Sequence, residues 1–335
     1  MKKLKGKPVT NASDPRQAKA AVDAVFRALD PDYLMILGAP DVVPHQDLKN
    51  LAGDDDAVAW GDLPYACEAP YSRNPETFIG PTRVVGRMPD LSGAREPSYL
   101  LGLLRTAAGY ERRPQQEYLD YFGLSAEVWK GSTAMSLGNV FGNATALLLA
   151  PPSGPGYPGG ELKARTHFVN CHGGPASPEF YGQRGSSYPV ALTTSDTEGR
   201  ITEGAVAAVE CCYGAELYDS VTLAIKMPIC QSYLKQGAYA YFGSTTIAYG
   251  PADTNGAADL ICQHFLLNVL DGASVGRAAL LARQQFVDGV AQVDPIDLKT
   301  LSQFCLLGDP SVHPVRSAAA AGVPKGLAGG EAERF

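Results

Sequence analysis

Two stretches of the chain, HFVNCHGG at 167–174 and AVAAVECCYGAE at 205–216, decide the expected fold. Each begins with a short apolar run, which is typical of a strand buried on both faces of a parallel sheet. The first run ends in His172 and two glycines, and the second ends in Cys212. Because ligand sites in parallel sheets lie beyond the carboxyl ends of the strands, we expect His172 and Cys212 to emerge at the same edge.

Around these two stretches, short apolar runs alternate with segments that have helical spacing of apolar residues. The expected strands lie at 33–38, 83–88, 132–137, 167–171, 205–212 and 238–244, with a small strand within 188–192. The expected helices lie at 17–29, 95–110, 221–236, 256–270 and 274–289. This alternation predicts an α/β fold, a three-layer sandwich whose mostly parallel central sheet is flanked by helices.

The chain divides into units by its composition. The expected units are a loose N-terminal segment at 1–15, a main domain at 16–316 and a disordered tail at 317–335. A Pro- and Gly-rich stretch at 150–160 separates candidate sub-domains at 16–149 and 161–316. Residues 44–80 are polar and rich in Gly, Pro and Asp, which indicates an elaborated loop.

The bulk composition excludes several classes of protein. The formal net charge is −7 and no long basic run occurs, so nucleic acid is not an expected partner. No window approaches the roughly 18 apolar residues of a membrane span, and no apolar stretch follows the basic N-terminus to make a signal peptide. The seven cysteines have neither disulfide-framework nor zinc spacing, which favours a reducing, cytoplasmic location.

The His and Cys motifs together suit acyl transfer. A thiol attacks a carbonyl as thiolate, and a nearby imidazole helps to form it and then protonates the leaving amine. The N–H groups of Gly173 and Cys212 are the natural donors to the oxyanion of the tetrahedral intermediate. Each residue also has a structural interpretation, since a strand-end His is often only hydrogen-bonded and a Cys is often a buried, inert thiol.

The two motifs resemble those of the caspase-like cysteine peptidases, a group that includes caspases, metacaspases, legumain, clostripain, separase and gingipains. The spacing of forty residues between His172 and Cys212 is near the roughly fifty expected for a caspase. The gingipain branch is the most similar, and the resemblance covers about 30–315. The segments that carry it are YLMILGAPDVVP at 33–44, DLPY at 62–65, VVGRMPD at 84–90 and LGDPSV at 307–312.

The resemblance also implies roles for the residues before the nucleophile. The family pattern has Ala directly before the Cys, which makes Cys212 the expected nucleophile and leaves Cys211 as the alternative. Glu210 stands where metacaspases, separases and clostripain-like enzymes carry an Asp that helps line the S1 pocket. It therefore implies a basic P1 residue, although legumain has Glu there and accepts Asn. The alternative is that Glu210 pairs with a nearby Arg.

The resemblance implies a cysteine endopeptidase that uses a Cys212–His172 dyad, cleaves after Arg or Lys and is self-processing and regulated. Candidate self-cleavage points in the flanking loops are Lys163, Arg165, Arg184 and Arg200. The alternative is a catalytically gated or inactive caspase-like module within a signalling or defence assembly. We expect no required cofactor, and a role for calcium stays open. The expected partners are a protein or peptide substrate and an activating protein, with no nucleic acid and no membrane.

Overall fold

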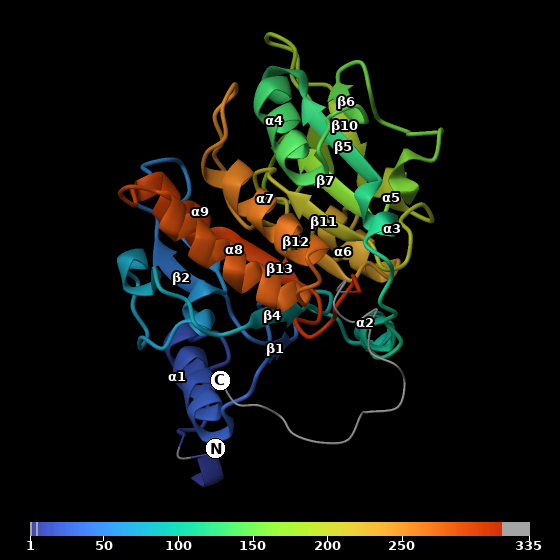
Figure 1. Cartoon of the computed structure of the whole chain (residues 1–335). Helices are drawn as coiled ribbons and strands as arrows, with labels where there is room; N and C mark the ends of the chain where they lie inside the picture. Colours follow the sequence, from blue (N-terminus) through green and yellow to red (C-terminus); the bar gives the residue numbers. More distant parts are fainter. Residues whose placement is uncertain (1, 5, 317–335) are drawn as a thin grey trace, which may run out of the picture.

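The computed structural model describes residues 2–4 and 6–316. Its centre is an eight-stranded sheet with the order β1-β4-β13-β12-β11-β7-β5-β6, and β1 and β6 lie at its opposite ends (Figure 1). In that order the strands are β1 (Leu34–Leu37), β4 (Val85–Met88), β13 (Phe304–Leu307), β12 (Ala240–Ser244), β11 (Val206–Val209), β7 (Thr166–Asn170), β5 (Tyr121–Ala126) and β6 (Leu147–Ala150).

The sheet consists of two parallel parts that run in opposite directions. Strands β12, β11, β7, β5 and β6 are parallel to one another, and so are β1, β4 and β13. The parts meet at β12 and β13, which pair antiparallel with Tyr241 opposite Leu307. The predicted mostly parallel sheet is confirmed, but only one part directs its carboxyl ends toward the edge that holds His172 and Cys212.

Helices cover both faces of the sheet, as the three-layer prediction required. On one face α4 (Lys130–Phe141), α7 (Ala257–Leu270), α8 (Val275–Gly289) and α9 (Pro295–Gln303) enclose a core that includes Phe168, Phe242 and Phe304. Figure 1 shows α7 and α8 beside β12 and β13. The other face is covered by α2 (Ser98–Ala108), α6 (Ile229–Lys235) and a small sheet of β8 (His172–Gly173), β9 (Glu179–Tyr181) and β10 (Val190–Thr193).

The remaining elements lie near the β1 end or are short. Helix α1 (Pro15–Leu29) begins with an Asp14 side-chain cap and packs near β1. Strands β2 (Gln46–Lys49) and β3 (Val58–Gly61) form a hairpin within the segment predicted to be a loop. The short helices are η1 (Lys2–Leu4), η2 (Leu63–Ala66), η3 (Pro75–Phe78), α3 (Gln116–Leu119), η4 (Glu127–Trp129), η5 (Glu161–Lys163) and α5 (Thr194–Thr197).

Two predicted elements differ from the structure. The predicted strand at 132–137 is wrong, because these residues belong to α4, whose buried residues recur at helical spacing from Ser132 to Val140. A six-residue segment with only a few apolar residues does not distinguish a strand from a buried helix. The predicted helix at 221–236 begins only at Ile229, since Pro228 would fall in the interior of the predicted helix, where proline removes a backbone hydrogen bond.

The predicted tail at 317–335 lies outside the described residues. The division into sub-domains stays a prediction, and the eight-stranded sheet takes strands from both candidate parts. No helix in the described part of the chain has both the length and the apolar character needed to cross a membrane.

Candidate active site

The strand register brings the His and Cys motifs together. Strands β7 and β11 are adjacent and parallel, with Thr166 opposite Val206 and Val169 opposite Val209. Each pair differs by forty residues, as do His172 and Cys212, so the two side chains leave neighbouring strands at equivalent positions.

Backbone contact confirms that the two motifs touch. A Cβ atom added to Gly173 would lie only 1.9 Å from the Cys212 carbonyl oxygen. The Gly173 backbone therefore packs directly on the Cys212 backbone, at a distance that no other residue type permits.

Cys212 is the cysteine nearest to solvent, and its thiol has a defined partner. Its Sγ accepts a hydrogen bond from Ala248 N at 3.3 Å and lies 3.6 Å from Ala248 O. Burial raises the pKa of the Cys212 thiol, and the Ala248 N–H partly opposes this by favouring the thiolate. The resting side chain is therefore a neutral thiol at pH 7, and a base must remove its proton before it can attack.

Cys211 has a different environment, although it is adjacent in sequence. It is fully buried in the core, as is Cys171 beside it on the neighbouring strand. Burial raises the pKa of Cys211 well above its usual range, and the Cys171 thiol adds to the effect. These two thiols belong to the packing beneath the site.

The His172 ring is held from three sides. Its Nε2 lies 2.7 Å from the Gln183 Oε1 atom. The Trp129 ring centroid is 4.4 Å away at an interplanar angle of 49°, and the Tyr188 ring meets it edge-on at 5.2 Å. Within the described chain His172 and Cys212 are not hydrogen-bonded to each other, and each has a separate resting partner. Catalytic hydrogen bonds are often long or absent in unliganded sites. The lack of a direct bond between His172 and Cys212 is therefore compatible with a dyad.

The turn after Cys212 is fixed by main-chain bonds. Tyr213 has a left-handed backbone with φ of 56°, and its N–H donates to Thr246 O. Ala215 N–H donates to Ser244 O, which joins this turn to the end of β12. Among the described residues the Cys212 N–H has no main-chain acceptor, which leaves it as a candidate donor to an oxyanion.

Glu210 is buried, with about 5% of its surface exposed. Neither of its carboxyl oxygens has a hydrogen-bond partner within the described residues. Burial raises the pKa of Glu210 well above its usual range, and the neighbouring Asp259 carboxyl raises it further. Within the described residues no Arg or Lys forms an ion pair with either group, so two buried carboxyl groups lie side by side, one of them two positions before Cys212 in the chain.

A buried charged cluster that the sequence did not indicate lies on the other flank of Cys212. The Lys299 side chain, from α9, is fully buried, with its Nζ 2.5 Å from Asp54 and 2.6 Å from Asp56. The Asp residues belong to the tip of the β2–β3 hairpin, about 245 residues away in sequence. We call Asp54, Asp56 and Lys299 the lysine clamp.

The lysine clamp holds two segments that adjoin Cys212: the turn that follows it and the segment of its partner Ala248. Asp56 accepts from the hydroxyl of Tyr213, directly after Cys212, and from Ile247 N–H, directly before Ala248. Asp54 accepts from the Tyr249 hydroxyl. Burial alone would raise the pKa of Asp54, but the bonds from Lys299 and Tyr249 outweigh it and hold the pKa below its usual range.

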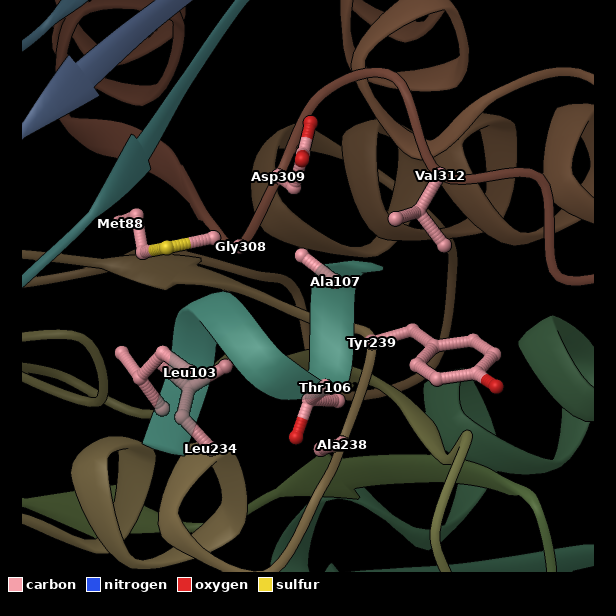
Figure 2. A pocket seen from close by; sticks show the side chains of 10 residues that line it. All are labelled: Met88, Leu103, Thr106, Ala107, Leu234, Ala238, Tyr239, Gly308, Asp309 and Val312. Carbon is pink, nitrogen blue, oxygen red and sulfur yellow. The ribbon is translucent and has the colours of Figure 1, made fainter. Parts of the chain in front are cut away.

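Two cavities differ in their relation to the site. One of about 640 Å³ is bounded by the hairpin and by the turn after Cys212, with Trp60, Tyr213, Glu216 and Thr246 among its lining residues. The other, of about 20 Å³, is lined by Met88, Gly308 and Tyr239 at the opposite edge of the sheet (Figure 2). Only the first is close enough to Cys212 to receive part of a substrate.

One cluster within the described residues has the spacing of metal ligands: His45, Asp62 and Cys305. The Arg87 guanidinium binds both oxygens of Asp62, at 2.6 and 2.8 Å. Burial would raise the pKa of Asp62, but Arg87 and His45 hold it well below its usual range. Since Arg87 already supplies the positive charge, the cluster is a buried ion pair and a poor cation site.

Solved structures resemble this chain along 91% of its length. Gingipain R (RgpB), described as an Arg-specific cysteine proteinase, matches with a TM-score of 0.60 at 12% identity over 69% of its own chain. The complex of Porphyromonas gingivalis RgpB pro- and mature domains matches with a TM-score of 0.61 at 12% identity over 70% of that chain. A structure described only as a protease gives 0.60 at 19% identity, also over 70%.

No protein-family model and no curated protein matches the sequence. The structural likeness nevertheless extends over nearly the whole chain. The chain therefore has the caspase-like fold of the cysteine protease gingipain R, and the resemblance inferred from the motifs is confirmed at the level of the fold.

Proposed function

We propose that this protein is a cysteine endopeptidase with Cys212 as nucleophile and His172 as general base and then acid. The observation that carries the proposal is the in-register convergence of the two motifs, with Gly173 packed on the Cys212 backbone. A fold shared with a cysteine protease supports it.

The reaction follows from the geometry of the site. His172 takes the Cys212 proton, and the thiolate attacks the substrate carbonyl to form a tetrahedral intermediate. The Cys212 N–H and the adjacent Gly173 N–H are the candidate donors to its oxyanion. His172 then protonates the leaving amine, and water hydrolyses the acyl-enzyme with the same ring acting as base.

The proposed P1 residue is Arg or Lys, with Glu210 as the S1 acid. The buried carboxyl pair of Glu210 and Asp259 has no counter-ion among residues 2–4 and 6–316, and an entering guanidinium would supply one. Because burial and Asp259 favour the protonated form of Glu210 while no cation is bound, a basic P1 residue should release a proton as it binds. Cleavage after Arg should accordingly improve with rising pH more steeply than cleavage after a neutral residue.

The alternative function is a gated module. It is supported by the separate hydrogen-bond partners of Cys212 and His172. The Cys212 thiol is held by Ala248 and the His172 ring by Gln183 in the resting chain. An activating protein, or calcium, could shift these groups toward each other.

Self-cleavage at Lys163, Arg165, Arg184 or Arg200 is a related proposal, although Arg184 pairs with Glu127 and Arg165 with Glu117. The free state of all seven cysteines supports the proposed cytoplasmic location.

The test is covalent labelling with a peptidyl chloromethyl ketone carrying Arg at P1, read by intact mass and peptide mapping. We expect one adduct at Cys212, lost in His172→Ala and weaker with Asn or Asp at P1. Labelling with no preference for Arg or Lys would contradict the S1 assignment alone. No adduct with any P1 residue, with and without calcium, would favour the gated or inactive module.

A further inference from the structure

The amide of Gln183 is oriented by three hydrogen bonds. Its Nε2 donates to Gly185 O at 3.0 Å and to the Tyr188 hydroxyl oxygen at 3.2 Å. Both N–H donors of the amide are thereby used, and the carbonyl oxygen faces the His172 Nε2 atom at 2.7 Å. Since an amide oxygen only accepts hydrogen bonds, the His172 Nε2 atom must carry the proton of this bond.

We infer that Gln183 is a positioning residue that selects the Nε2–H form of His172, which leaves Nδ1 as the atom that exchanges protons with Cys212. This inference rests on the proposed peptidase function. A neutral imidazole has one protonated and one free nitrogen, so fixing the first determines the second. In the opposite tautomer Nδ1 would carry a proton and could not accept one from the thiol.

The segment around Gln183 is rigid enough for this role. Arg184 and Ser187 exchange two backbone hydrogen bonds of 3.0 Å, which close a tight turn directly after Gln183. Gln183 N–H donates to Ala150 O at the end of β6, and a Cβ on Gly182 would lie 2.0 Å from the same oxygen. Tyr188, whose hydroxyl oxygen accepts a hydrogen bond from the Gln183 amide, also packs its ring edge-on against His172.

The bond with Gln183 persists through the proposed reaction. The proton leaves Cys212 Sγ for His172 Nδ1, which produces a thiolate and an imidazolium. The Nε2–H continues to donate to the Gln183 oxygen, now as a stronger, charge-assisted bond. When Nδ1 returns the proton to the leaving amine, the ring is again in the Nε2–H form and ready for the hydrolytic step.

Three variants test the assignment by kinetics. Gln183→Leu removes the acceptor, so we expect kcat to fall about 10–100-fold while KM changes less than about twofold. Gln183→Glu restores an acceptor and favours the protonated ring, so the acid limb of the kcat/KM profile should move to higher pH. Ser186→Ala, in the same turn, is the matched control and should behave as the wild type.

A second readout does not depend on activity. With ¹⁵N-labelled histidine, the five ring systems can be observed by NMR, and His172→Ala identifies the relevant one. We expect the neutral His172 ring to be Nε2-protonated in the wild type and a mixture of tautomers in Gln183→Leu. An Nδ1-protonated ring in the wild type would overturn the inference, as would an unchanged tautomer and kcat in Gln183→Leu. A wild type that cleaves no peptide would instead overturn the proposed function, while the tautomer still decides the role of Gln183.

Discussion

At the scale of single residues, the adjacent thiols of Cys211 and Cys212 differ in access to solvent. Cys211 is fully buried, whereas Cys212 is partly exposed and contacts the Ala248 N–H. Cys212→Ala should lower peptide hydrolysis more than about 1,000-fold. Cys211→Ala should retain activity and cost about 1 kcal/mol of stability, measured by urea unfolding. Activity that survives in Cys212→Ala and disappears in Cys211→Ala would reverse the assignment.

Substitution of Glu210 tests both its effect on the stability of the fold and its proposed role in P1 preference. Its pKa is raised by burial and by Asp259, so its proton stabilises the fold at acid pH and that contribution is lost as pH rises. Glu210→Gln should therefore unfold at the same urea concentration as the wild type at pH 4 and at a higher one at pH 9. If Glu210 recognises P1, the variant should also lose about 10–100-fold in kcat/KM for Arg substrates.

The control for Glu210 is Glu198→Gln, which alters an exposed carboxylate paired with Lys226. It should change neither the pH dependence of unfolding nor the P1 preference. A stabilised Glu210→Gln variant that still prefers Arg would show that the buried carboxyl is a structural group, and the P1 acid would have to be sought elsewhere.

At the scale of elements, the contact between the end of β7 and the end of β11 is testable through Gly173. In Gly173→Ala the added methyl would lie 1.9 Å from the Cys212 carbonyl oxygen, so the two strand ends must separate. A displacement of this size should reduce kcat/KM about 100-fold or more. Gly174→Ala is the control, because its nearest new contact is Ser177 Cβ at 3.9 Å. Equal effects of the two substitutions would argue against a special contact at Gly173.

The sequence predicted best the elements whose signal is local. The continuous apolar runs of β7 and β11, each ending at a polar motif, predicted strands, a sheet edge and the meeting of His172 with Cys212. Strand β5 was not predicted, and part of helix α4 was predicted to be a strand. Short segments with a few apolar residues fit either structure. The antiparallel joint between β12 and β13 depends on pairing across about sixty residues, and no local pattern encodes it.

The unpredicted parts of the site depend on contacts between distant segments. Trp129 meets His172 across 43 positions, and Lys299 reaches Asp54 across 245. Each of these residues is unremarkable in its own segment, since an Asp-rich loop or a helical Lys usually faces solvent. Only the folded chain shows that they lie around His172 and Cys212, as does Gln183, whose side chain contacts His172 and which stands directly before a tight turn.

At the scale of the whole molecule, the lysine clamp joins the N-terminal hairpin to the site formed by the rest of the chain. Lys299→Met leaves two partly buried carboxylates without a cation, which should destabilise the fold by about 1–3 kcal/mol at pH 7. In the wild type the lowered pKa of Asp54 contributes stability above about pH 4, and this is lost as pH falls. In the variant the stranded carboxylates take up protons readily. The difference in unfolding free energy between the two should therefore shrink from pH 7 to pH 4.

A second substitution separates the position of the nucleophile from the stability of the fold. Changing Asp54 and Asp56 to Asn together with Lys299→Met removes the whole charged group, which should recover much of the stability. The Cys212 thiol should nevertheless react more slowly with iodoacetamide, because Tyr213 and Ile247 lose their charged acceptor. Lys235→Met, at an exposed lysine, controls for the loss of a positive charge. If this triple variant is both stable and as reactive as the wild type, the lysine clamp serves folding alone, and the hairpin has no part in arranging the nucleophile.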